Sequence, residues 1–273
     1  MNISHGVFQS LLAFCFVSVA GSAAPAEAPE KPYQPVEGQE GKDVVWVPTP
    51  FALVEKMLDM AGVTAEDYVV DLGSGDGRNV IAAAKRGARA LGVEFNPNMV
   101  DLSKRTAAKE GVADKATFVE GDMFEADISQ ATVLALFLLP DNLRKLTPKF
   151  LALRPGTRIV ANGFGIGGWD PDETGRADGD CGSWCTALLY IVPARVEGTW
   201  RLPQGELALE QKFQVLSGTL SSGGARTPIS SGRLRGDQIT FTVGGTRYEG
   251  RVNGDTMMGK SAAGAWSASR VSE

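Results

Sequence analysis

The feature that most constrains this chain is a glycine-rich loop between a short apolar run and a helical pattern. Residues 69–79 read VVDLGSGDGRN, in which three glycines alternate with other residues. Glycines at this density weaken any helix or strand that contains them. They let backbone N–H groups come close to a ligand at the N-terminus of the following helix. The loop therefore predicts a small-molecule site at the end of a strand.

Strand and helix patterns alternate around this loop. The predicted strands are 68–72, 90–94, 116–120, 132–139, 158–162 and 186–193, and the predicted helices start near residues 51, 79, 97 and 140. Thr49 is the expected N-cap of the first helix, and Asn96 is the expected N-cap of the third. Such alternation is typical of an α/β fold with a doubly wound parallel sheet, whose ligands bind beyond the carboxyl ends of the strands.

Three carboxylates at strand ends narrow the choice of ligand. The loop has neither the Gly-x-Gly-x-x-Gly spacing of a dinucleotide site nor the Gly-Lys-Ser/Thr ending of a P-loop. Asp71 would repel phosphates and attract a cationic group, which fits an amino acid head group. Glu94 closes the second strand, where an acid accepts from ribose hydroxyls. Asp122 follows the third strand and could accept from an adenine amino group. Together these groups describe S-adenosylmethionine.

The segments VVDLGSGDGRN, LGVEFNP, FVEGDMF and LALFLLP resemble the class I S-adenosylmethionine-dependent methyltransferases, from about Val47 to Pro193. The resemblance implies a Rossmann-like seven-stranded sheet with S-adenosylmethionine as cofactor. It implies that Glu94 holds the ribose and Asp122 the base. The residues implied at the methionine end are Asp71, Gly73, Ser74, Gly75 and Gly77.

VPTP, DLGSGDGR and the LLP ending are also similar to small protein-lysine methyltransferases with a hydrophobic N-terminal segment. That similarity favours a protein amine as the methyl acceptor. LLP followed by Asp141 and Asn142 departs from the Asn-Pro-Pro-Tyr signature of enzymes that methylate amino groups of nucleic acids and glutamine. The acceptor therefore stays open.

The acceptor side offers three candidate catalytic residues, Asp141, Asn142 and Asn162. Pro140 and Asp141 also read as an ordinary helix start. The loop 163–185 is long for a plain connection and contains Trp169 and Trp184, which either form an acceptor wall or plug the loop onto the sheet.

Cysteine and histidine usage bears on metal binding and on redox state. Cys181 and Cys185 form a disulfide in an oxidising compartment or stay free thiols in the cytosol. The single histidine is His5, so we expect no metal site.

The two ends of the chain have compositions of their own. Residues 1–24 predict a signal peptide, and hence a periplasmic or secreted protein, with a membrane anchor as the alternative. Residues 25–43 read as a Pro/Glu-rich linker, and 44–195 as the methyltransferase domain. Residues 196–273 predict a small antiparallel β domain, resembling a calycin-like barrel, with Trp200 and Trp266 as interior plugs.

The favoured function is methyl transfer to a protein lysine amine. Two alternatives stay open: an exported protein that binds S-adenosylmethionine or a nucleoside without turnover, and a small-molecule methyltransferase. The net charge of −5 gives no basic field, so we expect no nucleic-acid partner. Membrane association would come through the N-terminal segment.

Overall fold

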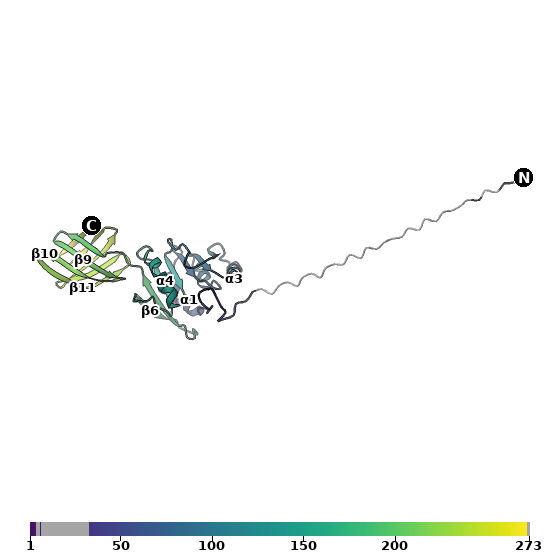
Figure 1. The fold of residues 1–273 in the computed structure, drawn as a ribbon, viewed down its shortest axis with the longest axis horizontal. Coiled ribbons are helices and arrows are strands. Elements are labelled where there is room, and N and C mark those ends of the chain that lie inside the picture. Colours follow the sequence, from purple (N-terminus) through teal and green to yellow (C-terminus); the bar gives the residue numbers. More distant parts are fainter. Residues whose placement is uncertain (4–5, 7–32, 272–273) are drawn as a thin grey trace. The chain divides into compact units, whose positions relative to one another are not determined.

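A computed structural model describes residues 1–3, 6 and 33–271. The chain divides into two units, Met1–Pro32 and Tyr33–Glu273, and the helices and strands of the described residues all lie in the second (Figure 1). The predicted signal peptide or anchor falls almost wholly outside the described residues. No helix in the described part of the chain is both long enough and apolar enough to cross a membrane.

A seven-stranded sheet forms the first half of the second unit. Its helices are α1 Phe51–Met60, α2 Arg78–Lys85, α3 Pro97–Lys109 and α4 Pro140–Leu151. Its strands are β1 Tyr68–Leu72, β2 Arg89–Glu94, β3 Ala116–Glu120, β4 Val133–Leu136, β5 Arg158–Asn162, β6 Glu173–Arg176 and β7 Thr186–Ile191. The order across the sheet is β3-β2-β1-β4-β5-β7-β6. β1 to β5 run parallel, whereas β7 is antiparallel to both of its neighbours.

Helices cover both faces of this sheet. Buried side chains of α1, α2 and α3 pack into one apolar cluster that includes Val69 of β1. Buried side chains of α4 pack into a second cluster that includes Val70 and Leu72. Side chains of a strand alternate between the faces, so neighbouring residues of β1 enter opposite layers. This two-sided burial confirms the predicted doubly wound sheet, but the antiparallel strand β7 makes the sheet mixed and not wholly parallel as predicted.

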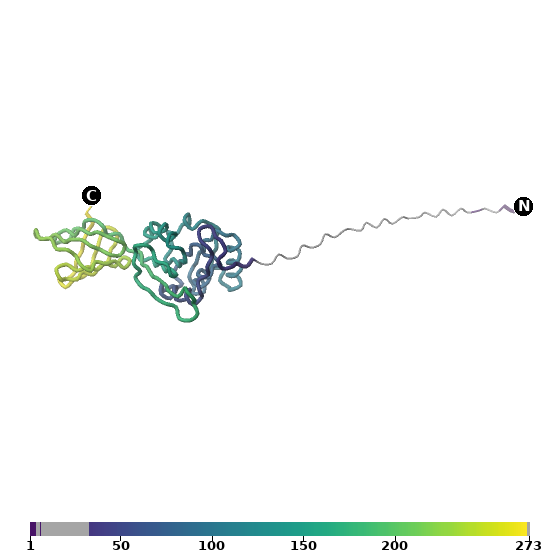
Figure 2. The backbone as a smooth tube through the Cα atoms, turned by 60° about the horizontal axis from the view of Figure 1, so that its bottom comes forward, coloured from purple at the N-terminus to yellow at the C-terminus, as the bar shows by residue number. Residues whose placement is uncertain are grey.

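The second half is a closed antiparallel barrel, whose tube is coloured green to yellow in Figure 2. Its strands are β8 Gly198–Leu202, β9 Gly205–Lys212, β10 Val215–Ser222, β11 Ala225–Arg235, β12 Gln238–Val243, β13 Thr246–Asn253, β14 Thr256–Ser261 and β15 Gly264–Arg270. Trp200 and Trp266 belong to the apolar cluster of the barrel, as predicted. Phe213 lies in the turn after β9, and Val215 of β10 is 48% exposed.

Three details of the chain differ from the sequence-based expectations. Pro50, not Thr49, is the N-cap of α1, and Thr49 is buried with its hydroxyl accepting from Asn162 at 3.3 Å. The chain is folded before residue 44, since the Gly38 N–H donates to the Trp46 carbonyl at 2.8 Å. The loop 163–185 contributes β6 as an edge strand, which its Gly- and Asp-rich composition gave no reason to expect.

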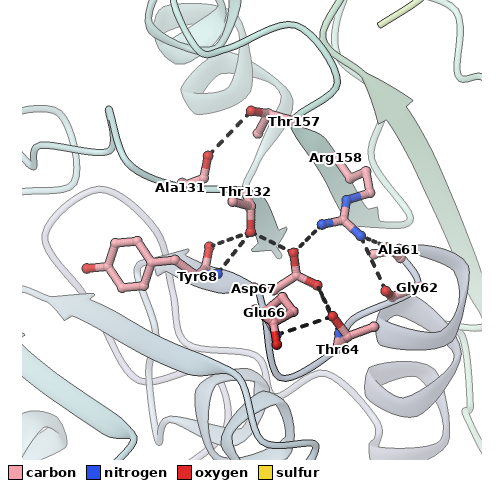
Figure 3. Close-up of polar contacts among 10 residues, drawn as sticks. All are labelled: Ala61, Gly62, Thr64, Glu66, Asp67, Tyr68, Ala131, Thr132, Thr157 and Arg158. Atoms are coloured by element: carbon pink, nitrogen blue, oxygen red, sulfur yellow. Dashed lines mark hydrogen bonds and ion pairs between the residues drawn. The ribbon is translucent and has the colours of Figure 1, made fainter.

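A partly buried ion pair between Asp67 and Arg158, with the hydroxyl of Thr132 beside it, joins the chain at the amino ends of β1, β4 and β5 (Figure 3). The carboxylate of Asp67 accepts from the Thr64 N–H at 2.9 Å, from the Thr132 hydroxyl at 2.8 Å and from the guanidinium of Arg158. Arg158 also donates to the Ala61 carbonyl at 2.7 Å. Burial alone would raise the pKa of Asp67, but these hydrogen bonds and the nearby positive charge outweigh it and lower the pKa.

We expect Asp67→Ala to lower the free energy of unfolding by about 3 kcal/mol, because it leaves Arg158 and the Thr132 hydroxyl without their partner. Glu110→Ala, which removes the exposed pair with Lys85, should cost less than about 0.5 kcal/mol. Denaturant unfolding followed by far-UV circular dichroism measures both. The Asp67 contribution is present above the ordinary carboxylate pKa of about 3.9 and is lost as pH falls through the lowered folded-state value. A pH-independent difference between Asp67→Asn and the parent would contradict this account.

Candidate active site

A cavity of about 300 Å³ opens at the carboxyl ends of the parallel strands. One side is formed by residues 38–49, which we call the strap. The floor is formed by the loops after β1, β2 and β3, and the remaining side by residues that follow β4 and β5 and precede β7. This is the edge of an open α/β sheet at which ligands bind, beside the point where strand order reverses between β1 and β4.

The glycine loop bends around the end of β2. The N–H groups of Gly73 and Ser74 donate to the carbonyl of Val93 at 2.8 and 3.1 Å. Gly75 adopts φ +54°, and a Cβ there would lie 2.6 Å from Nε1 of Trp46 in the strap. Only a residue without a side chain fits this backbone and leaves the strap in place.

The third glycine of the loop has a different role from the other two. Gly73 and Gly75 line the cavity, but Gly77 is not part of its wall. Gly77 is the left-handed N-cap of α2, and a Cβ there would meet the Phe118 ring at 2.6 Å and the Ser103 hydroxyl at 2.8 Å. It allows α2 and α3 to pack closely on the sheet. Its predicted contact with the cofactor stays a prediction.

Asp71 ends β1 in the cavity wall with 3% of its surface exposed. Its Oδ2 accepts from Nδ2 of Asn79 at 3.1 Å. Burial raises the pKa of Asp71 well above its usual range, and the charges of Glu94 and Asp76 raise it further. A cationic group bound beside Asp71 would favour the ionised form, so its binding is coupled to release of a proton.

Glu94 connects the loops that follow β1 and β2. Its Oε2 accepts from the Gly75 N–H and its Oε1 from the Asn96 N–H, both at 2.9 Å. A carboxylate oxygen has two lone pairs, so each oxygen can accept one more hydrogen bond from the cavity. This geometry suits the paired hydroxyls of a ribose.

Asp122 lies in the cavity wall just after β3. One oxygen accepts from the Phe124 N–H at 2.8 Å, and the other pairs with the ammonium of Lys42 in the strap. The hydrogen bond from Lys42 lowers the pKa of Asp122, and the Phe124 N–H lowers it further. The Lys42 Nζ also lies 4.8 Å from the centre of the Phe95 ring. Lys42 belongs to the predicted linker and Phe95 to the segment LGVEFNP, and the sequence predicted neither as a cavity residue.

These residues fit S-adenosylmethionine. The fit rests on the acceptor set: the carboxylates of Asp71, Glu94 and Asp122 follow β1, β2 and β3 along one cavity wall, in the order that an amino group, a ribose and an adenine would require. Ser74 is a cavity residue, but its buried hydroxyl lies beside Gly92 of β2, where a Cβ would be 2.6 Å from it. The side chains that would hold the cofactor are those of Asp71, Glu94 and Asp122, with the backbone of Gly73, Ser74 and Gly75.

Three aromatic rings form the other end of the cavity, and we call them the aromatic wall. Phe137 follows β4, Phe164 follows β5, and Trp184 precedes β7. The Trp184 ring centre lies 4.9 Å from that of Phe137 and 5.3 Å from that of Phe164. Of the two predicted wall tryptophans, only Trp184 lines the cavity. Trp169 plugs the loop instead, stacking on Phe213 with ring centres 5.3 Å apart.

A disulfide closes the turn that carries Trp184. Cys181 and Cys185 are bonded, with their Cα atoms 5.2 Å apart. Inside this turn the backbone N–H of Trp184 donates to the Cys181 carbonyl at 2.9 Å. Of the two redox states that the sequence leaves open, the structure contains the oxidised one. Within the described residues no group of three or more histidine, cysteine, aspartate or glutamate side chains could hold a metal ion.

The three candidate catalytic residues lie at the edge of this arrangement, and none is in the cavity wall. Asp141 is exposed in the first turn of α4 and pairs with Arg144 at 3.1 Å. Asn142 belongs to the same helix and is buried. Asn162 ends β5, donates to the Thr49 hydroxyl, and has a buried Oδ1 without a partner in the described part of the chain. The catalytic roles of these three residues stay predictions. Asn162 is hydrogen-bonded to Thr49, a strap residue that lines the cavity.

Comparisons with known proteins match the sheet half of the chain. The family model described as the ANTKMT methyltransferase domain matches residues 71–173. The protein-lysine N-methyltransferase of Saccharolobus islandicus is 42% identical over 153 residues, which cover 55% of this chain and 94% of that protein. The adenine nucleotide translocase lysine N-methyltransferase of Mus musculus is 36% identical over 105 residues, 38% of this chain and 46% of that enzyme. This chain thus spans slightly less than half the length of that mammalian relative.

A solved structure supports the same fold and cofactor. The crystal structure of an RNA methyltransferase from Salinibacter ruber, in complex with S-adenosyl-L-homocysteine, is 44% identical, with a TM-score of 0.51. It covers 55% of this chain and 96% of that one. The match leaves the barrel half of this chain uncovered.

We expect Glu94→Gln to weaken binding of S-adenosylhomocysteine by about 10- to 100-fold, because it exchanges a charged acceptor for a neutral one in a site that must pair with two hydroxyls. Glu120→Gln is the matched control, since Glu120 is paired with Glu94 in register but is exposed and lies outside the cavity. Isothermal titration calorimetry measures both affinities. Equal affinities of the two variants would contradict the assignment of Glu94.

Proposed function

The chain belongs to the protein-lysine N-methyltransferases, within the class I S-adenosylmethionine-dependent methyltransferases, and we propose that it methylates lysine amines of a protein acceptor. The observation that carries the proposal is the division of one cavity into an acidic end at β1, β2 and β3 and an aromatic end at β4, β5 and β7. The acidic end fits the cofactor. The aromatic end fits a long apolar side chain that ends in nitrogen.

The cofactor supplies, when bound, a methyl group on a sulfonium: an amine nitrogen can attack the methyl carbon, the carbon–sulfur bond breaks, and the sulfur leaves as a neutral thioether. The contribution of the protein is alignment and a suitable electrostatic setting. Asp71 and Glu94 would orient the two ends of the cofactor that carry its amino group and its ribose. The strap, pinned by the pair between Lys42 and Asp122, would exclude water from above.

A lysine ammonium has to lose its proton before the nitrogen can accept a methyl group. That proton can go to water or to a carboxylate, so the chemistry needs no histidine base. The aliphatic part of a lysine side chain would lie along Leu138, Leu139 and the aromatic wall, all of which line the cavity. This apolar passage supports lysine over a bulkier polar acceptor.

Incubation with S-adenosylmethionine labelled in its methyl group tests the proposal. We expect label in the protein fraction of an extract, recovered as methylated lysine after hydrolysis, and at least tenfold less with Glu94→Gln at a cofactor concentration below the parent Kd. Label recovered in RNA would instead favour the activity named for the Salinibacter ruber protein. Cofactor binding without transfer to any fraction would favour a binding protein that lacks turnover.

Export of the chain is part of the proposal. Two observations support it: the apolar segment 7–24 and the bond between Cys181 and Cys185, since disulfides persist mainly in oxidising compartments. We expect the protein in the periplasmic or membrane fraction, with those cysteines protected from alkylation until a reductant is added. A variant that lacks residues 2–24 should stay in the cytosol. If the full-length chain is found there with two reactive thiols, export is wrong.

A further inference from the structure

We propose that the aromatic wall binds the methylated ammonium group of the acceptor lysine by cation–π attraction, so that partly methylated lysine is retained for further transfer. This inference rests on the proposed function. It concerns the recognition of the lysine nitrogen after methylation has begun. The residues that carry it are Phe137, Phe164 and Trp184.

Sheet topology separates the wall from the cofactor end of the same cavity. The carboxylates of Asp71, Glu94 and Asp122 follow β1, β2 and β3, which lie on one side of the reversal in strand order. The rings follow β4 and β5 and precede β7, on the other side. An acceptor that enters along the rings therefore meets the cofactor near β1, at the boundary between the two halves.

The chemistry of this end suits a diffuse positive charge. The cavity residues beyond β1 on that side are Phe137, Leu138, Leu139, Phe164 and Trp184, and none of them is a carboxylate. An unmodified ammonium is strongly hydrated and holds compact charge, which favours water or a carboxylate. Methyl groups spread the charge and weaken hydration, and aromatic faces bind such groups well, as in the aromatic cages that recognise methyl-lysine.

Trp184 is held in place by contacts on several sides. Its turn is closed by the Cys181–Cys185 disulfide, and its ring lies against Gly163, where a Cβ would be 3.1 Å from the indole. Both phenylalanine rings meet it in edge-on contacts, with interplanar angles of 65° and 62°. A ring held from three directions is preorganised, so little entropy is lost when a ligand binds to it.

The test compares two probes of nearly the same shape, with the protein saturated with S-adenosylhomocysteine. One probe is Nα-acetyl-Nε-trimethyl-lysine amide, and the other is its neutral isostere, in which carbon replaces the quaternary nitrogen. We expect the charged probe to bind about 5- to 30-fold more tightly, measured by NMR chemical-shift titration. Trp184→Leu should remove this preference, and Trp184→Phe should retain part of it.

Phe51→Leu is the matched control, because Phe51 is an aromatic residue of α1 that is 69% exposed and lies outside the cavity lining. It should leave the preference for the charged probe unchanged. Near-UV circular dichroism and S-adenosylhomocysteine affinity verify that each variant is folded. Equal binding of the two probes to the parent, no binding of either, or a preference that survives Trp184→Leu would each overturn the inference. A parent that prefers the charged probe but methylates no lysine would overturn the proposed function and leave this site standing.

Discussion

Parallel pairing of β1 with both β2 and β4 is the constraint on which the rest of this structure depends. It brings the carboxyl ends of those strands to one edge of the sheet and makes their loops leave in opposite directions. The cavity lies where those loops diverge. Its carboxylates follow β1, β2 and β3, and its aromatic rings lie next to the ends of β4, β5 and β7. Glu94 then fixes the local shape, because its hydrogen bonds to Gly75 and Asn96 tie two of the loops together.

The strap forms one side of the cavity at the edge of the sheet. Trp46 fits over Gly75, where a Cβ would not be accommodated, and Lys42 pairs with Asp122. The same ammonium lies near the Phe95 ring, so Lys42, Asp122 and this ring form one contact group. A ligand that uses Asp122 to bind an adenine amino group has to share or displace Lys42. The binding of such a ligand would be coupled to the position of the strap through this ion pair.

The barrel is attached to the acceptor side of the sheet by specific contacts. Phe213 adopts φ +53°, an uncommon conformation for a residue with a side chain, and stacks on Trp169. Arg233 pairs with the buried carboxylate of Asp172 at 2.8 Å, and Gln214 donates to the Asp170 carbonyl at 2.6 Å. The partners Trp169, Asp170 and Asp172 lie in the loop 163–185, which also contains Phe164 of the aromatic wall. The barrel therefore supports the loop that supplies one side of the acceptor end.

The sequence by itself determined the buried strands of the sheet, the glycine loop and the acids at the strand ends, because each is a local pattern: an apolar run, a positive-φ turn, a polar residue where the run stops. The edge strand β6 has no apolar run, and only tertiary structure decided it. Tertiary structure alone decided which side chains share the cavity. Lys42 reaches Asp122 across 80 residues, and Phe137, Phe164 and Trp184 meet only because β4, β5 and β7 are neighbours. It also assigned Trp184 to the cavity and Trp169 to the barrel contact, although both belong to one glycine-rich loop. The local sequence around these two tryptophans cannot predict their different positions, because the burial of each ring depends on residues that are distant in the sequence.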